Sequence, residues 1–324
     1  ILHEHLPEVT KNRPQWTDRI ARVLQACEQL GTTISEPKAC WIHRDFYADQ
    51  LVPTGELFRA MQRGTIDAVQ SDDDSMASPT EVTVFGGYFP FASRYSLDVP
   101  VLFNQYGLNE IWAEEYAKVG VKHISAGSWD PCHFATKDPI NSLADLQGKR
   151  VFTFPTAGRF LQQFGVVPVT LPWEDIEVAV QTGELDGIAW SGITEDYTVG
   201  WADVTNYFLT NNISGAWIGH FFANMGRYEE LPEDLKLLLA TCMEQSHYYR
   251  QWWYWGGEAR LRVHGEKMQL TTIPDAEWDQ VEAAAQTFWD EIAAESETKA
   301  KVVEIFKQYN ADMAKAGRPY RYNT

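Results

Sequence analysis

Aromatic and acidic side chains that directly follow predicted buried strands are the strongest candidates for binding chemistry. Trp190 follows the apolar run 185–189, and Asp72 and Asp73 follow the apolar run 66–69. In open α/β sheets, ligands bind beyond the carboxyl ends of the strands. An indole face attracts a cation, and buried carboxylates require a cation or hydrogen-bond donors. These residues therefore predict a pocket for a small polar solute.

Four further side chains complete the candidate set. Phe152 lies on a predicted strand and would pack against Trp190, while Trp129 follows another strand and would form a wall of the pocket. Asn212 precedes a strand and offers hydrogen bonds, and Glu4 lies near the end of the first predicted strand. A core tryptophan, an exposed acidic turn and a turn-forming asparagine are the structural alternatives for these residue types.

An internal repeat indicates how these residues are positioned. The segment 57–67 returns as 176–186, and Ala, Gln, Gly and Asp recur in register. Each copy predicts an amphipathic helix that ends at a left-handed glycine, Gly64 or Gly183, and is followed by an acid and a buried strand. Chance similarity of two helix–glycine–strand units is the alternative. The repeat favours two lobes built on one plan, with their strand ends facing each other across a ligand.

Helices and short apolar strands alternate along the chain, which is typical of an α/β fold. With 324 residues, two compact lobes are expected. We expect lobe I to comprise residues 1–123 plus about 214–250, and lobe II to comprise 124–213 plus about 260–310. An aromatic-rich helix over 232–267 is expected to span both lobes.

Composition excludes several classes of function. The net charge is −18, with 45 acidic against 27 basic residues, so a nucleic-acid partner is not expected. Most of these acids are interpreted as a solvated surface. No stretch approaches the roughly 20 consecutive apolar residues of a membrane-spanning helix, so the chain is not expected to be embedded in a membrane. The abrupt start, without a leader pattern, is compatible with a leader that has been removed.

Catalytic and metal-binding motifs are absent from the sequence. The chain contains no GxSxG, HExxH, GxGxxG or GxxxxGK[ST] pattern, so we expect a binding protein and not an enzyme, although a site assembled from distant residues stays open. The cysteines form no CxxC pair, and no metal site is predicted. Cys27 and Cys40 could form a disulfide, or all four cysteines could be buried thiols.

The segment 138–150, with the sequence DPINSLADLQGKR, resembles the solute-binding proteins of tripartite ATP-independent periplasmic (TRAP) transporters. The resemblance extends to residues 50–53, 164–169 and 173–186, and to Trp190. Each motif alone is weak, but the set occurs in the expected order and covers most of the chain.

The resemblance implies the two-lobed periplasmic binding protein fold, with a long helix spanning both lobes and no cofactor. It also implies periplasmic localisation and delivery of a small-molecule solute to TRAP membrane permease subunits. The family's ligand is most often a small organic acid, whose carboxylate is held by an arginine on the strand after the Asp-Leu-x-Gly turn. Closure of the lobes around the ligand is the expected mechanism.

Two departures from the family pattern bear on the ligand. Phe152 occupies the position of the anchoring arginine, and Arg150 and Arg159 are the nearest substitutes. The acidic run 72–74 stands where relatives tend to carry aromatic residues. The family resemblance still favours a small organic acid or similar polar solute. The alternative is a cationic or zwitterionic solute in a pocket lined by aromatic residues and aspartates.

Overall fold

The structure is a computed structural model that describes residues 41–43 and 52–317. Glu4 and the two cysteines Cys27 and Cys40 lie outside the described residues. These described residues belong to one compact unit. They form two sheets, one of four strands and one of six.

The four-stranded sheet has the strand order β1-β2-β9-β3. Strand β1 is parallel to β2, whereas β9 is antiparallel to both of its neighbours. Strand β9 lies between β2 and β3 and is almost entirely buried, and helices α5, α6 and α11 pack against β3. The strands are β1 (Trp41–His43), β2 (Ala68–Ser71), β3 (Val121–Ser128) and β9 (Ile218–Asn224), and the helices around them are α4 (Leu57–Gln62), α5 (Asp98–Gln105), α6 (Leu108–Ala117) and α10 (Met225–Glu229).

The six-stranded sheet has the order β10-β8-β4-β7-β5-β6. Strand β4 is antiparallel to β7 and β8, and the other pairs are parallel. The strands are β4 (Phe134–Thr136), β5 (Arg150–Phe152), β6 (Val167–Val169), β7 (Gly187–Ala189), β8 (Tyr207–Leu209) and β10 (Gln269–Thr271), and the helices that connect them are α7 (Pro155–Leu161), α8 (Ile176–Thr182) and α9 (Ile193–Val199).

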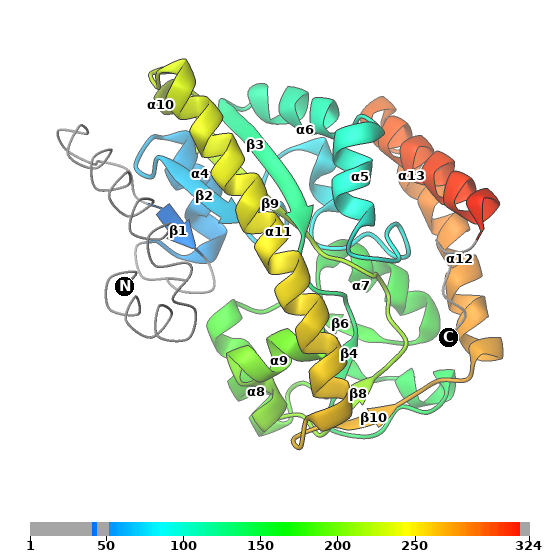
Figure 1. Ribbon diagram of the computed structural model, residues 1–324. Helices are drawn as coiled ribbons and strands as arrows, with labels where there is room; N and C mark the ends of the chain where they lie inside the picture. Colours follow the sequence, from blue (N-terminus) through cyan, green and yellow to red (C-terminus); the bar gives the residue numbers. More distant parts are fainter. Residues whose placement is uncertain (1–40, 44–51, 318–324) are drawn as a thin grey trace, which may run out of the picture. The chain divides into compact units, whose positions relative to one another are not determined.

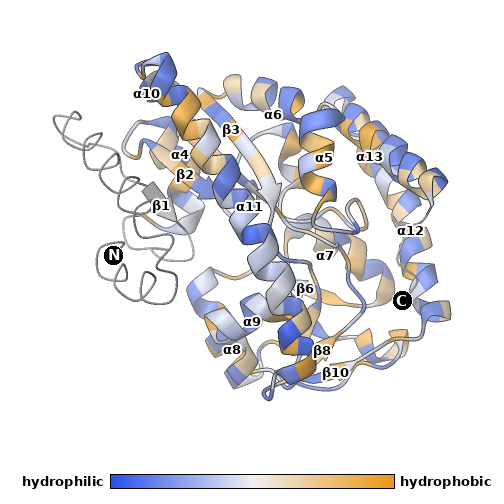
Figure 2. Cartoon of the chain, viewed as in Figure 1, coloured by the Kyte–Doolittle hydropathy of each residue, from blue (hydrophilic) through white to orange (hydrophobic). Residues whose placement is uncertain are grey.

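Helix α11 (Glu233–His264) joins the two sheets, because it packs against β3 of one and α9 of the other (Figure 1). Two further helices follow, α12 (Asp275–Ala293) and α13 (Glu297–Ala316). Figure 2 shows hydrophobic and hydrophilic residues alternating along both, as expected for helices with one buried face. Within residues 41–43 and 52–317, none of the helices combines the length and apolarity needed to cross a membrane.

The internal repeat is confirmed by the backbone. Helix α4 precedes β2 and α8 precedes β7, and Gly64 and Gly183 adopt positive φ angles of 73° and 79°. A side chain is strained in this left-handed region, so glycine is favoured there. The repeated aspartate that follows, Asp186, forms an ion pair with Arg150 at 2.8 Å. Asp186 directly precedes β7 and so lies at the amino end of this strand, whereas the residues after Ala189 lie at its carboxyl end.

Candidate ligand-binding site

Trp190 lies at the centre of a buried aromatic cluster. The ring centroids of Phe152, Phe154 and Trp217 lie 5.4, 4.4 and 5.1 Å from that of Trp190. Phe152 ends β5 and Trp190 directly follows β7, so two parallel strands of the six-stranded sheet supply their carboxyl ends. Trp217 precedes β9 of the other sheet. The cluster therefore connects the two sheets through side chains that are at most 6% exposed.

Tyr88 closes the cluster from the side of the four-stranded sheet. Its backbone neighbour Gly87 pairs with β9, and its ring lies 5.7 Å from that of Phe154. The Tyr88 hydroxyl donates to the carbonyl oxygen of Ala189, and it lies 2.7 Å from the Thr153 hydroxyl, which can donate to it. One buried phenol thus links a loop of the first sheet to the ends of β5 and β7.

Two buried carboxylates, those of Asp130 and Asp196, lie beside this cluster. One oxygen of Asp130 accepts a hydrogen bond from the Gly192 amide at 2.7 Å, and one oxygen of Asp196 accepts from the Ser191 hydroxyl at 3.0 Å. The two aspartates are 0% and 1% exposed. The second oxygen of each, Oδ1 of Asp130 and Oδ2 of Asp196, has no hydrogen-bond partner among the described residues. A buried acceptor of this kind is costly unless a ligand satisfies it.

Glu195 and Glu258 add two more buried acids. Tyr254 donates its hydroxyl proton to Glu195 at 2.8 Å. Glu258 accepts from the Thr194 amide at 3.1 Å and is paired with Arg262 at 3.1 Å. Because Tyr254, Glu258 and Arg262 all lie on α11, the long helix holds these acids in place from one side.

Burial and mutual repulsion shift the titration of these acids in one direction. Desolvation raises the pKa of Asp130 well above its ordinary value, and the negative charge of Glu195 raises it further. The pKa of Asp196 is also raised well above its ordinary value, chiefly by burial and then by the charges of Glu258 and Glu195. Burial raises the pKa of Glu258 as well, while Arg262 opposes this shift. The group of acids therefore favours a proton or another cation in its midst.

Trp129, a predicted site residue, borders the cluster. It is 1% exposed, its ring meets that of Trp217 edge-on at 4.7 Å, and the Arg250 guanidinium lies 4.6 Å from its centroid. A Cβ atom on Gly219 would lie 2.0 Å from the Trp129 ring, so this packing requires glycine on β9.

Asp72 and Asp73 are fully buried where the chain leaves β2 of the four-stranded sheet. Asp73 accepts from the Trp112 indole at 3.3 Å and from the Tyr116 hydroxyl, and it lies 2.9 Å from Nε2 of His220. Asp72 accepts from the Ser75 amide at 2.7 Å. The structure therefore places Asp73 in a polar network inside this part of the molecule.

The remaining predicted residues lie apart from the aromatic cluster. Arg150 forms a two-pronged pair with Asp186, at 3.0 and 2.8 Å. Arg159 is half exposed and pairs with Glu295 on α12 at 2.7 Å. Asn212 is partly buried in the loop after β8. Both arginines considered as carboxylate anchors thus have acidic partners of their own.

The sequence analysis did not single out Asp130, Asp196, Trp217, Phe154 or Tyr88. A signal existed for the first two. Asp130 adjoins the candidate Trp129, and Asp196 lies in the first turn of the helix that follows the strand end at Trp190. The other three are ordinary aromatic residues in sequence, and only the packing of both sheets brings them together.

The family model of the bacterial extracellular solute-binding proteins, family 7 (DctP), matches residues 50–296. A solved structure of a TRAP periplasmic solute-binding protein from Chromohalobacter salexigens DSM 3043 is 88% identical, with a TM-score of 0.83. The match covers 85% of this chain and 87% of that chain, and that protein was crystallised with bound (S)-(+)-2-amino-1-propanol.

Two more distant proteins are also similar. The periplasmic ectoine-binding protein of the TeaABC TRAP transporter from Halomonas elongata is 19% identical, with a TM-score of 0.70, over 79% of this chain and 86% of that chain. The monocarboxylate 2-oxoacid-binding periplasmic protein of Nostoc sp. PCC 7120 is 24% identical over 82% of this chain and 73% of its own length.

The chain belongs to the DctP family of bacterial extracellular solute-binding proteins, which serve TRAP transporters. The predicted α/β, two-lobed binding-protein fold with a helix spanning both lobes is confirmed. As a member of this family, the protein acts in the periplasm, binds a small solute and works with membrane permease subunits.

Proposed function

We propose that this protein captures a small protonated amine, of the size of an amino alcohol, for a TRAP transporter. The observation that carries the proposal is the pair of buried carboxylate oxygens, on Asp130 and Asp196, that lack a hydrogen-bond partner beside aromatic rings. An ammonium group supplies a positive charge and up to three donors, which is what these oxygens need.

The aromatic rings suit the same ligand. A cation over an indole or phenyl face gains about 0.5–2 kcal/mol, more as it is desolvated. Trp190, Trp217 and Phe154 meet at centroid distances of 4.4–6.0 Å, and Tyr88 packs on Phe154. These faces also accommodate the short carbon chain of an amino alcohol. The ammonium would pair with the aspartates, and the carbon atoms would contact the rings.

The comparisons support this ligand class. The protein from Chromohalobacter salexigens is 88% identical to this chain and holds 2-amino-1-propanol, which carries a primary amine. At this level of identity, the same buried residues and the same ligand class are expected. The engagement of Arg150 and Arg159 by acids agrees with a ligand that needs no arginine.

An organic acid is the second candidate ligand, because the Nostoc relative is named for monocarboxylate 2-oxoacids. Such a ligand would have to approach Asp130, Glu195, Asp196 and Glu258, whose negative charges oppose it. In either case we propose a binding protein without turnover of its ligand. The lobe boundaries expected from the sequence also remain our proposal.

Isothermal titration calorimetry with three matched ligands tests the proposal. (S)-2-Amino-1-propanol is the cation, 1,2-propanediol is a neutral analogue of similar size, and lactate carries a carboxylate. We expect strong binding of the amine alone. Tighter binding of lactate than of the amine would contradict the proposal and favour the organic-acid interpretation.

A pair of variants tests whether Asp196 contributes to the affinity for the amine. Asp196→Asn should weaken amine binding by about 100-fold, because loss of one partner of a buried charge pair costs about 2–5 kcal/mol. Asp279→Asn removes the same charge from an exposed position on α12 and should leave the affinity unchanged. Equal affinity in both variants would exclude Asp196 from the site.

A further inference from the structure

The outer face of α11 is unusually rich in apolar and aromatic side chains. Twelve large hydrophobic residues lie exposed in the part of the chain that the structure describes, and eight of them belong to this one helix. These eight are Leu237, Leu238, Tyr248, Tyr249, Trp252, Trp253, Trp255 and Val263.

Polarity along α11 is the reverse of that in an ordinary surface helix. Its buried positions include His247, Arg250 and Glu258, whereas a surface helix normally buries its apolar side. Between Leu237 and Val263, the only charged residues classed as exposed are Glu244 and Arg260. The outer face of this helix is therefore more apolar than is expected for a face that contacts only water.

Five of these eight residues lie on one continuous stripe of exposed side chains, and Leu238, Tyr249 and Trp253 flank it. The residues of the stripe recur at intervals of three or four positions, the spacing that keeps side chains on one side of an α-helix. We call this set the α11 stripe, and it comprises Leu237, Thr241, Gln245, Tyr248, Trp252, Trp255, Ala259 and Val263. The stripe contains no charged residue, and it runs along nearly the whole helix.

The eight exposed hydrophobic residues of α11 together present an area that matches one side of a stable protein interface. Tyr248, Tyr249 and the three tryptophans are 39–62% exposed, and at about 150–250 Å² per aromatic side chain they present on the order of 500 Å². The three exposed aliphatic residues bring this to roughly 700–800 Å². Each partner of a standard interface contributes about 800 Å².

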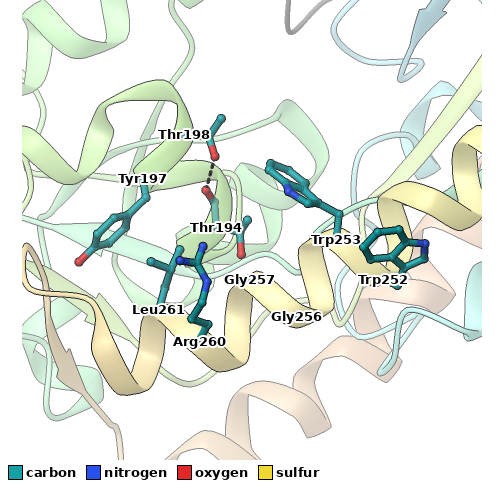
Figure 3. A pocket seen from close by; sticks show the side chains of 9 residues that line it. All are labelled: Thr194, Tyr197, Thr198, Trp252, Trp253, Gly256, Gly257, Arg260 and Leu261. Carbon is teal, nitrogen blue, oxygen red and sulfur yellow. Dashed lines mark hydrogen bonds between the residues drawn. The ribbon is translucent and has the colours of Figure 1, made fainter. Parts of the chain in front are cut away.

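A groove lies next to the stripe. Trp252, Trp253 and Arg260 of α11 line it together with Tyr197 and Thr198 of α9, and its volume is about 530 Å³ (Figure 3). A groove with aromatic walls and an arginine is typical of the core of a protein–protein interface. It offers room for an aromatic side chain from a partner.

We propose that the α11 stripe is the contact between two copies of this chain, related by a two-fold axis with their α11 helices antiparallel. A two-fold interface uses the same patch on both copies, so it must be complementary to itself. The stripe fits this requirement, since it combines large rings at Trp252 and Trp255 with the small residues Thr241 and Ala259. With the two-fold axis beside Tyr248, Trp255 of one copy can pack over Thr241 of the other, and Ala259 over Leu237.

Charge restricts which face two copies can share. Each copy carries a net charge of −18, which opposes association, so two copies can meet only at a face of low local charge, and the α11 stripe has no charged residue. A membrane surface is the less favoured partner. Helices that lie on membranes carry Lys and Arg on a solvated polar face, whereas the opposite side of α11 is buried against β3 and α9.

Sedimentation velocity of the purified chain tests this proposal without any ligand, so its outcome is independent of the proposed function. We expect a dimer of the 37.0 kDa chain. Because salt screens the repulsion between the copies, the dimer should be tighter at high ionic strength. The double variant Trp252→Glu/Trp255→Glu should sediment as a monomer with an unchanged circular dichroism spectrum.

Val178→Glu is the matched control, since Val178 is an exposed apolar residue of α8 and lies outside the stripe. This variant should remain dimeric. A monomeric wild-type chain up to about 100 µM, or a dimer that persists in the double variant, would overturn the proposal. Binding of a monomer to phosphatidylglycerol vesicles would overturn it too, and would assign the stripe to a membrane surface.

Discussion

At Asp196, burial and neighbouring negative charge act in the same direction. Both raise the pKa of the carboxyl group, and neither is offset by a cation bonded to it among the described residues. Asp73 is also a buried carboxylate, but it has hydrogen-bond donors within the protein. Trp112 and Tyr116 both donate hydrogen bonds to it. Asp73 is thus satisfied within the fold, whereas we propose that a ligand satisfies Asp196.

Asp196→Asn should stabilise the ligand-free protein while it weakens binding. The amide removes a buried negative charge and can still accept from the Ser191 hydroxyl. We expect a gain of about 1 kcal/mol in the free energy of unfolding, which raises Tm by roughly 2 °C in a chain of this size. Differential scanning calorimetry without ligand measures this. A lower Tm would show that the charge of Asp196 is compensated in the free protein.

Amine binding should weaken as the pH falls below neutral. The pKa values of Asp130 and Asp196 are raised, so these groups begin to take up protons above their ordinary range, and a protonated carboxyl no longer attracts an ammonium. The more basic amine stays charged over this range. The dissociation constant should therefore rise by up to about tenfold per pH unit for each proton taken up.

Calorimetry in buffers with different ionisation enthalpies checks the same linkage, since binding should release protons. Asp196→Asn should flatten the pH dependence. Affinity is a better measure than the free energy of unfolding here. The buried His123 changes the pH dependence of stability in the direction opposite to that of Asp130 and Asp196. Burial holds the pKa of His123 well below its ordinary value, so acidification below that ordinary value destabilises the fold. An affinity that is constant between pH 5 and 8 would contradict the proposed role of the acids.

At the scale of elements, the site depends on how closely α11 approaches α9. Gly257 faces Thr194, the residue whose amide holds Glu258, and an added Cβ would lie 2.4 Å from the Thr194 hydroxyl oxygen. Its neighbour Gly256 points outward, where an added Cβ meets nothing within 4 Å. Two adjacent glycines of one helix therefore have different structural roles.

Gly257→Ala should destabilise the protein by about 1–3 kcal/mol, because overpacking forces the two helices apart. It should also weaken amine binding, since Glu258 shifts with Thr194. Gly256→Ala is the matched control, and its higher helix propensity should stabilise the protein by up to about 1 kcal/mol. Chemical denaturation of both variants measures the difference. Equal stabilities would show that α9 adjusts without cost.

At the scale of the whole molecule, Tyr88 provides a contact that ligand-dependent closure of the two lobes would make or break. Its hydroxyl joins a loop of the four-stranded sheet to Ala189 and Thr153 of the six-stranded sheet. In a two-lobed binding protein, such a bond is made when the lobes close around the ligand. The free energy of closure therefore contributes to the measured affinity.

Tyr88→Phe should weaken amine binding by up to about tenfold, the loss expected for one or two hydrogen bonds at 0.5–1.5 kcal/mol each. Small-angle X-ray scattering should show that 2-amino-1-propanol compacts the wild-type protein, and that the variant needs more ligand for the same compaction. The closure mechanism would be wrong if the amine binds in calorimetry but leaves the radius of gyration unchanged.

The sequence by itself determined the α/β class, the repeated helix–glycine–strand unit, the spanning helix and the position of Trp190 after a strand. These features follow from local periodicity and from backbone preferences such as those of Gly64 and Gly183, which neighbouring residues suffice to reveal. Only the tertiary structure decided which acids are buried together. Asp130 and Asp196 lie on separate segments, and they meet because the ends of both sheets and α11 pack around them. The energy of a buried charge depends on every group that surrounds it, and that information is not local in the sequence.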